Sequence, residues 1–186
     1  VVRCFEDREI VHVVGQVDPV KDVETINLEL ILADLEVVNR ALSKLEKLAI
    51  TGDKSVRADY ETLVTAQNCL NAGKKIITAK ILVEPNSVLK NLNLLTSKPT
   101  LYLANVSENG FQQNRYLEQL QTFAQQENSK VIPVCAKWEA EMNELSSEER
   151  ELFRRELKMQ EAGLERVIKA GYDLLGLQTY FTAGPK

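Results

Sequence analysis

The sequence has little of the chemistry that metal sites and disulfide frameworks need. It contains one histidine, His12, and three cysteines, Cys4, Cys69 and Cys135, which lie far apart and form no Cys-x-x-Cys pair. A structural zinc site takes four such ligands, and an odd number of distant cysteines does not indicate a disulfide framework. We therefore expect no metal ligands in this chain and three free thiols, as in a reduced cytoplasm.

Long apolar runs and a strong charge bias are also missing. No apolar run reaches the roughly 20 residues that a membrane span requires, and no signal-peptide pattern opens the sequence. The formal net charge of −4 on 186 residues argues against a generic polyanion binder. We expect a cytoplasmic protein with no membrane partner. Because the chain starts at Val1 without methionine, and both ends fall beside strand-like segments, we also expect a fragment.

A helical hairpin is predicted between residue 22 and about residue 72. Asp22 is expected to cap a long helix in which apolar residues recur at spacings of three and four, the period of a coiled coil. Thr51-Gly52-Asp53 interrupts it, and a second helix is expected from Lys54 to Ala72. Two helices joined by a tight turn form an antiparallel pair. The apolar stripe of the first helix comprises Leu28, Ile31, Leu35, Val38, Leu42, Leu45 and Ala49.

Strands and helices alternate in the rest of the sequence. Apolar runs at residues 1–5, 101–104 and 131–135 predict buried strands, and residues 10–14 form a further apolar segment. Short helices are expected around Val88 to Leu95, over 115–126 and about 138–145, and over 147–157 and 164–175, with Ser146 and Ser147 as N-cap residues before two glutamates. This order predicts an α/β fold with a parallel sheet, into which the helical hairpin is inserted.

Polar and small residues follow two of the predicted strands directly. Asn105-Val106-Ser107-Glu108 comes after strand 101–104, and Cys135-Ala136 comes at the end of the next. Ligands of open parallel sheets bind at the carboxyl ends of the strands. An Asn-x-x-Glu sequence also occurs as an ordinary helix cap or turn, so both interpretations stay open on this pattern alone.

Other groupings of reactive side chains do not indicate catalysis. Asp34 with Glu36, and Glu139 with Glu141, are carboxylate pairs on helices, but residues two apart do not share a helix face. Ser146 has no histidine partner in the sequence around it. We therefore assign no catalytic residue to this chain.

Several segments, taken together and in order, resemble the Obg-like ATPase (YchF) family of P-loop nucleotide hydrolases. The resemblance covers nearly the whole chain except about residues 51–90, and it is carried by residues 3–7, 10–13, 17–19, 93–99, 104–108, 132–136, 168–172 and 178–184. It implies that the chain holds the C-terminal half of a P-loop NTPase sheet. The implied domains are 1–21, part of the nucleotide-hydrolase domain; 22–96, the inserted coiled-coil hairpin; 97–177, the base-recognition half; and 178–186, the start of a TGS domain.

The resemblance also implies a function and a set of site residues. It implies an ATPase that prefers ATP to GTP, uses Mg²⁺, and associates with the ribosome through the hairpin and the TGS domain. Glu108 stands where guanine-specific relatives carry an aspartate that accepts two hydrogen bonds from guanine, so strong guanine selectivity is not expected. The implied nucleotide-contacting residues are Asn105, Val106 and Glu108 in the specificity turn, Cys135 and Ala136 in a small-residue loop, and Phe5 as an apolar wall near adenine.

The sequence also departs from the family pattern. It holds no Gly-x-x-x-x-Gly-Lys-[Ser/Thr] phosphate loop, which we expect upstream of Val1 together with the Mg²⁺ ligands. The isolated chain is therefore expected to be inactive. An alternative is a non-catalytic adaptor that acts through the helical hairpin, whose predicted tip carries the basic residues Arg40, Lys44, Lys47, Lys54 and Arg57.

Overall fold

The structure is a computed structural model that describes residues 1–7, 15–49, 54–79, 81, 87–157 and 161–184. The chain forms two compact units, Val1–Val20 with Thr100–Lys186 and Lys21–Pro99. We call the first the sheet unit and the second the helical unit. The apolar segment 10–14 with His12 and the hairpin turn 51–53 lie outside the described residues.

A parallel sheet forms the centre of the sheet unit. Its described strands are β1 (Val2–Arg3), β2 (Leu101–Asn105) and β3 (Lys130–Val134), in the order β1-β2-β3. Both pairings are parallel, so the predicted α/β fold with a parallel sheet is confirmed. Tyr102 and Ala104 are buried in β2, as expected for a strand covered by other elements.

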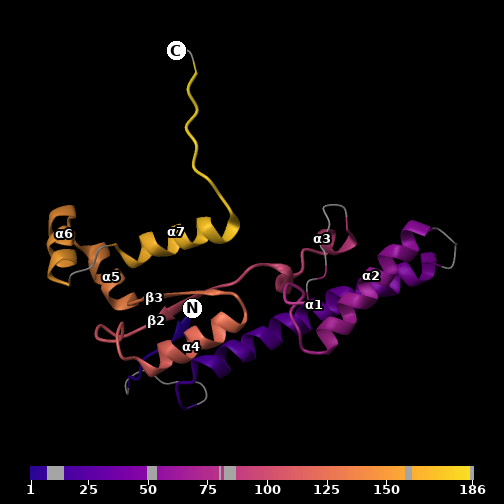
Figure 1. Ribbon diagram of the computed structural model, residues 1–186, viewed down its shortest axis with the longest axis horizontal. Coiled ribbons are helices and arrows are strands. Elements are labelled where there is room, and N and C mark those ends of the chain that lie inside the picture. Colours follow the sequence, from indigo (N-terminus) through magenta and orange to yellow (C-terminus); the bar gives the residue numbers. More distant parts are fainter. Residues whose placement is uncertain (8–14, 50–53, 80, 82–86, 158–160, 185–186) are drawn as a thin grey trace. The chain divides into compact units, whose positions relative to one another are not determined.

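Helices cover this sheet. Helices α4 (Arg115–Gln126) and α7 (Gly163–Leu175) both pack against β2 and β3, and they lie on opposite sides of the sheet (Figure 1). Leu117, Leu120 and Ala124 form the buried stripe of α4 at helical spacing. Helices α5 (Ala136–Glu144) and α6 (Ser147–Glu156) lie between β3 and α7 in the chain.

The helix starts in this region were predicted with mixed success. The predicted cap of α6 is confirmed, because Ser146 and Glu149 form a reciprocal capping box. The expected start of α5 near Trp138 is wrong by two residues. The helix begins at Ala136 with Cys135 as its N-cap residue, so the small-residue loop after β3 is the first turn of a helix.

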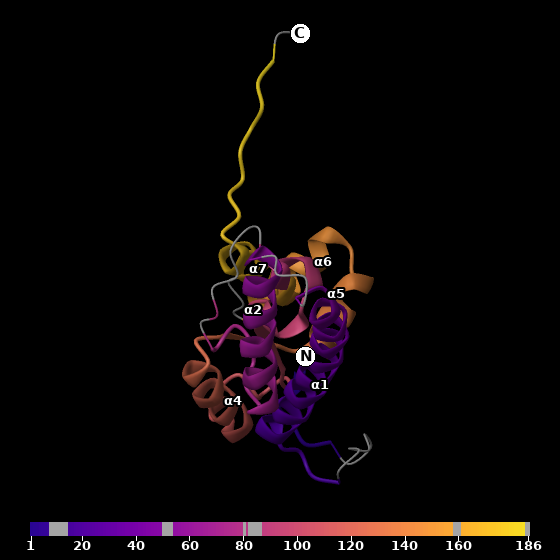
Figure 2. The same ribbon diagram turned by 90° about the vertical axis from the view of Figure 1, so that its right-hand side faces the viewer.

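In the helical unit, α1 (Pro19–Ala49) and α2 (Lys54–Asn71) run side by side (Figure 2). Their contact is polar at one point, where Gln67 Nε2 donates to Asn39 Oδ1 over 2.7 Å. Short helices α3 (Val88–Leu92) and η1 (Leu95–Ser97) follow, separated by Asn93 in the left-handed region. The buried core of the unit consists of Ile31, Val38, Leu42, Leu63, Ala66, Leu70, Ile76, Leu89 and Leu94.

Two details of the predicted long helix are wrong. It begins at Pro19, not after a cap at Asp22, because proline suits the first helical position, where its missing N–H has no intrahelical partner to lose. Leu28 is not part of the seam, since it is 53% exposed. Helix α2 has 18 residues and α1 has 31, so in an antiparallel pair α2 does not reach the first turns of α1.

A buried carboxylate ties α1 to the end of the helical unit. Asp34 is 2% exposed, and it accepts hydrogen bonds from the backbone N–H groups of Leu95 (2.8 Å) and Thr96 (2.7 Å) at the start of η1. Glu36, two residues on, is exposed. The two carboxylates therefore point to different faces, as the helical period requires.

Candidate functional site

The carboxyl ends of the three strands lie at the same level. Arg3 is in register with Asn105, and Asn105 is in register with Val134. The segments that follow the strands therefore leave the sheet at a common edge. These segments, together with Asn105 at the end of β2, contain all six residues predicted to contact a nucleotide. This edge is where open parallel sheets bind ligands.

Asn105 joins the turns that follow β2 and β3. Its side-chain oxygen accepts a hydrogen bond from the backbone N–H of Ala136 (3.1 Å), and the N–H of Val106 donates to the carbonyl of Val134 (2.9 Å). These two bonds hold the specificity turn against the start of α5. Asn105, Val106 and Ala136 are thus brought together, although 31 residues separate Asn105 from Ala136.

Glu108 forms an ion pair that the sequence did not indicate. Its Oε1 accepts from Lys137 Nζ over 2.7 Å, with 42% of the Glu108 side chain and 67% of the Lys137 side chain exposed. The hydrogen bond from Lys137 lowers the pKa of Glu108, and the same contact raises the pKa of Lys137. Glu108 is therefore a solvent-accessible carboxylate, and Lys137 is a residue of this site that our sequence reasoning missed.

Val106 and Cys135 are enclosed by the sheet unit. They are 2% and 3% exposed, so their side chains pack inside the unit and do not lie on its open surface. Burial raises the pKa of the Cys135 thiol, which keeps it protonated and unreactive at neutral pH. The groups exposed at this edge are the side chain of Glu108, the half-buried Asn105 and the small side chain of Ala136.

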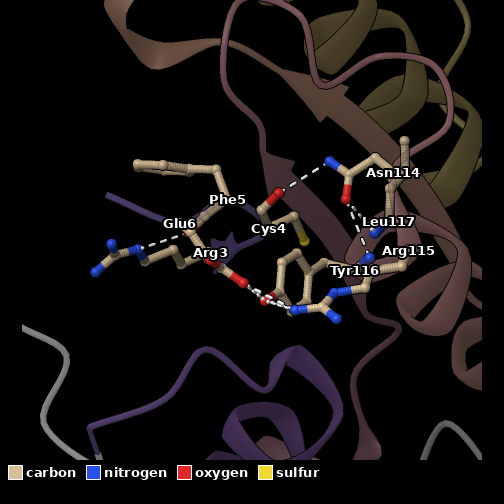
Figure 3. Close-up of polar contacts among 8 residues, drawn as sticks. All are labelled: Arg3, Cys4, Phe5, Glu6, Asn114, Arg115, Tyr116 and Leu117. Atoms are coloured by element: carbon tan, nitrogen blue, oxygen red, sulfur yellow. Dashed lines mark hydrogen bonds and ion pairs between the residues drawn. The ribbon is translucent and has the colours of Figure 1, made fainter. Parts of the chain in front are cut away.

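Phe5 lies half-buried beyond the end of β1. The guanidinium of Arg3 is 4.9 Å from the centre of the Phe5 ring, and the Phe5 side chain points away from the start of α4 (Figure 3). Phe5 and Ser107 both line an open cavity of about 370 Å³, whose other lining residues come mostly from the segment 110–116 around the start of α4. Phe5 and the specificity turn thus border the same cavity.

A polar network fastens the end of β1 to the start of α4 (Figure 3). Asn114 caps α4 by accepting from the N–H groups of Tyr116 (3.0 Å) and Leu117 (3.2 Å), while its Nδ2 donates to the carbonyls of Cys4 and Gly110, both at 2.9 Å. An asparagine directly before a helix is a recognisable N-cap signal, so Asn114 could have been found from the sequence.

Glu6 completes this network. It accepts from Arg115 Nη2 (2.8 Å) and from the hydroxyl of Tyr116. These two hydrogen bonds, that of Tyr116 first, lower the pKa of Glu6. Both partners come from α4, so the segment that carries Phe5 is held to the same helix that follows the specificity turn.

The described part of the chain does not assemble a metal site. Among those residues, no group of three or more histidine, cysteine, aspartate or glutamate side chains is arranged to hold an ion. The Mg²⁺ implied by the family resemblance therefore has no ligand set among them. In the same part of the chain, no helix combines the length and apolar character needed to cross a membrane.

Known proteins resemble this chain along its whole length. It is 48% identical over 190 residues to the ribosome-binding ATPase YchF of Escherichia coli O157:H7, and 46% identical over 187 residues to that of Bacillus subtilis strain 168. These alignments cover 100% and 99% of the chain, and 51% of each relative. The resemblance to the YchF family is confirmed. No family model matches the sequence.

A solved YchF structure has the same fold. The YchF GTPase of Schizosaccharomyces pombe is 30% identical and superimposes with a TM-score of 0.83, covering 98% of this chain and 51% of that protein. The chain thus spans about half the length of the YchF proteins that it matches. The sheet unit and the helical unit are together the part of the YchF fold that this chain represents.

Proposed function

We propose that this chain forms the base-recognition half of a nucleotide-binding site in a ribosome-associated ATPase. The observation that carries the proposal is the common edge at which β1, β2 and β3 end, with Asn105 bonded to Ala136 across it. Relatives along the whole chain carry the names ribosome-binding ATPase and GTPase, which supports both parts of the proposal.

In this proposal, the exposed groups at the strand ends receive the base. Asn105 holds the two turns together, Glu108 offers a carboxylate to the amino group of adenine, and Ala136 leaves room for the ring. Val106 and Cys135 are buried, so they shape the turns from beneath. Phe5 supplies apolar surface in the cavity that Ser107 also lines. Adenine presents one amino group, which a single carboxylate oxygen of Glu108 can accept. The whole protein would therefore bind ATP at least as well as GTP.

The phosphate groups need partners that the 186 residues do not contain. The sequence has no Gly-x-x-x-x-Gly-Lys-[Ser/Thr] loop, whose backbone N–H groups and lysine cradle phosphates in P-loop enzymes. Hydrolysis, and Mg²⁺ binding with it, therefore belongs to the whole protein in this proposal. The isolated chain should show no saturable ATPase activity.

Binding to the ribosome is assigned to the helical hairpin and to the TGS domain that residues 178–186 would begin. The exposed Arg40, Lys44 and Arg57 provide positive charge on α1 and α2, and cations of this kind contact phosphate backbones. This assignment places the protein in the cytoplasm, where ribosomes work.

Replacing Asn105 by alanine in the whole protein tests the proposal. Loss of the bond to Ala136 should loosen the two turns and weaken ATP binding about tenfold, which is a change of about 1.4 kcal/mol. Asn143→Ala is the matched control, because Asn143 is an exposed asparagine of the same unit, on α5, outside the candidate site. Fluorescent-nucleotide titration measures both. Equal ATP affinity in the two variants, or a wild-type protein that favours GTP tenfold, would contradict the proposal.

A further inference from the structure

Three consecutive residues of α5 contact residues 105–111, the end of β2 and the segment after it, at three evenly spaced positions. The backbone of Ala136 donates to Asn105, the ammonium of Lys137 to Glu108, and the ring of Trp138 stacks on Phe111 with centroids 5.4 Å apart and planes 13° apart. The ion pair therefore lies between a backbone hydrogen bond and an aromatic stack.

Separate contacts hold the two partners of the ion pair, Glu108 and Lys137, in place. The turn around Glu108 is closed by the hydrogen bond from Gly110 N–H to the carbonyl of Ser107 (2.9 Å), and Asn114 Nδ2 holds the carbonyl of Gly110 (2.9 Å). A Cβ at Gly110 would lie 3.1 Å from the backbone nitrogen of Ser107, so glycine lets the turn close tightly. Because Lys137 starts from a helix held against this turn, its ammonium reaches Glu108 without ordering a loop.

The pairing changes what Glu108 can accept. A carboxylate has two oxygens, and guanine presents two neighbouring donors, N1–H and the 2-amino group, which a carboxylate receives with both. Lys137 binds Oε1 over 2.7 Å, and an oxygen engaged by an ammonium is a weaker acceptor for a further donor. Guanine needs both oxygens for its two neighbouring donors, whereas adenine needs only one for its amino group, so the ion pair disfavours guanine more than adenine.

We propose that Lys137 is a positioning residue for base selectivity, which holds one oxygen of Glu108 and thereby favours ATP over GTP. The inference rests on the proposed nucleotide site. It goes beyond that site because it assigns the preference for ATP over GTP to an ion pair. The length of the Glu108 side chain alone is the other explanation of that preference.

The experiment compares ATP and GTP affinities of the whole protein and its Lys137→Met variant by fluorescent-nucleotide titration. Methionine keeps the length of the side chain and removes its charge and donors. With Oε1 released, GTP affinity should rise about fivefold while ATP affinity changes less than about twofold. Lys137→Arg, which can still donate to Glu108, should keep the wild-type ratio.

Lys130→Met is the matched control. Lys130 forms an ion pair with Asp173 at 3.3 Å, with both side chains 57% exposed, but it lies at the opposite end of β3. Its replacement removes the same charge and should leave the ratio of ATP to GTP affinity unchanged. A Lys137→Met ratio equal to that of Lys130→Met would overturn the inference.

The outcomes also separate this inference from the proposed function. If the wild type binds ATP, Glu108→Gln alters nucleotide affinity, and Lys137→Met leaves the ratio unchanged, the nucleotide site stands and the role of Lys137 is wrong. If neither Asn105→Ala nor Glu108→Gln alters nucleotide binding, the proposed site itself is wrong, and the role of Lys137 is wrong with it.

Discussion

The helical unit and the sheet unit each contain a carboxylate on one helix that holds the start of another helix, but in different surroundings. In the helical unit Asp34, 2% exposed, receives the N–H groups of Leu95 and Thr96 at 2.8 and 2.7 Å. In the sheet unit the half-buried Glu139 on α5 receives those of Gly163 (2.7 Å) and Leu164 (3.4 Å) at the start of α7. A negative charge is favourable at both places, because the N–H groups of a helix start point outward.

The difference lies in how deeply the carboxylate itself is buried. Asp34 is 2% exposed, whereas Glu139 is half-buried, although each helix start has one buried residue, Thr96 or Gly163, and one exposed residue, Leu95 or Leu164. A buried N–H group without a partner costs more than one that water can solvate. Glu108 differs from both, since 42% of its side chain is exposed and its partner is the ammonium of Lys137. Asp34 and Glu139 thus bond to the backbone at the start of a helix, whereas the main partner of Glu108 is a side-chain ammonium.

Removing the buried carboxylate should have the largest effect. Asp34→Ala leaves two backbone donors without a partner in the helical unit, and it should lower the free energy of unfolding by about 3 kcal/mol. Glu36→Ala on the same helix is exposed and should change it by less than about 0.5 kcal/mol. Urea unfolding followed by far-ultraviolet circular dichroism measures both. Similar small losses in the two variants would remove the contrast between the units.

The corresponding change in the sheet unit should be smaller. Glu139→Ala removes the carboxylate from the start of α7 and should cost about 1 kcal/mol, with the exposed Glu141→Ala as its control. A Cβ on Gly163 would lie 2.5 Å from Glu139 Oε1, so Gly163→Ala should displace the same carboxylate. In a double-mutant cycle, the double variant should therefore lose less free energy of unfolding than the two single variants lose in total. Full additivity would show that they act on separate contacts.

Charge at the hairpin should give the smallest effect, and it tests whether the helical unit has a role in binding. Reversing Lys47, Lys54 and Arg57 to glutamate should weaken co-sedimentation with ribosomes about threefold at low salt and leave ATP affinity unchanged. Of these, Arg57 forms an exposed pair with Glu61 at 3.3 Å, while the side chains of Lys47 and Lys54 lie outside the described residues.

The control for this charge reversal uses the same unit. Lys74, Lys90 and Lys98 are exposed lysines of the helical unit outside α1 and α2, and reversing them changes the net charge equally. Equal sedimentation of both triple variants across a salt series would leave the basic residues of α1 and α2 as solvated surface.

The candidate site could be predicted where it depends on the order of strands. The position of Asn105, Glu108 and Ala136 at one edge of the sheet follows from the order of the strands, because parallel strands end at one edge, while their assignment to a nucleotide came from the family resemblance. Lys137 could not be found in this way. It is one of many lysines, and only the rotation of α5, which begins at Ala136, directs its side chain to Glu108. The assignment of the six residues to a nucleotide, and of the domains to their roles, stays a prediction.

By itself, the sequence determined the α/β class, the paired helices and the family, because these depend on periodicity and on the order of local segments. Only the tertiary structure decided which polar side chains meet. Asp34 and Leu95 lie 61 residues apart, Glu139 and Gly163 24 apart, and Glu108 and Lys137 29 apart. Such contacts depend on the packing of whole elements, and a carboxylate on a helix has the same local pattern whether it meets water, a backbone N–H or an ammonium.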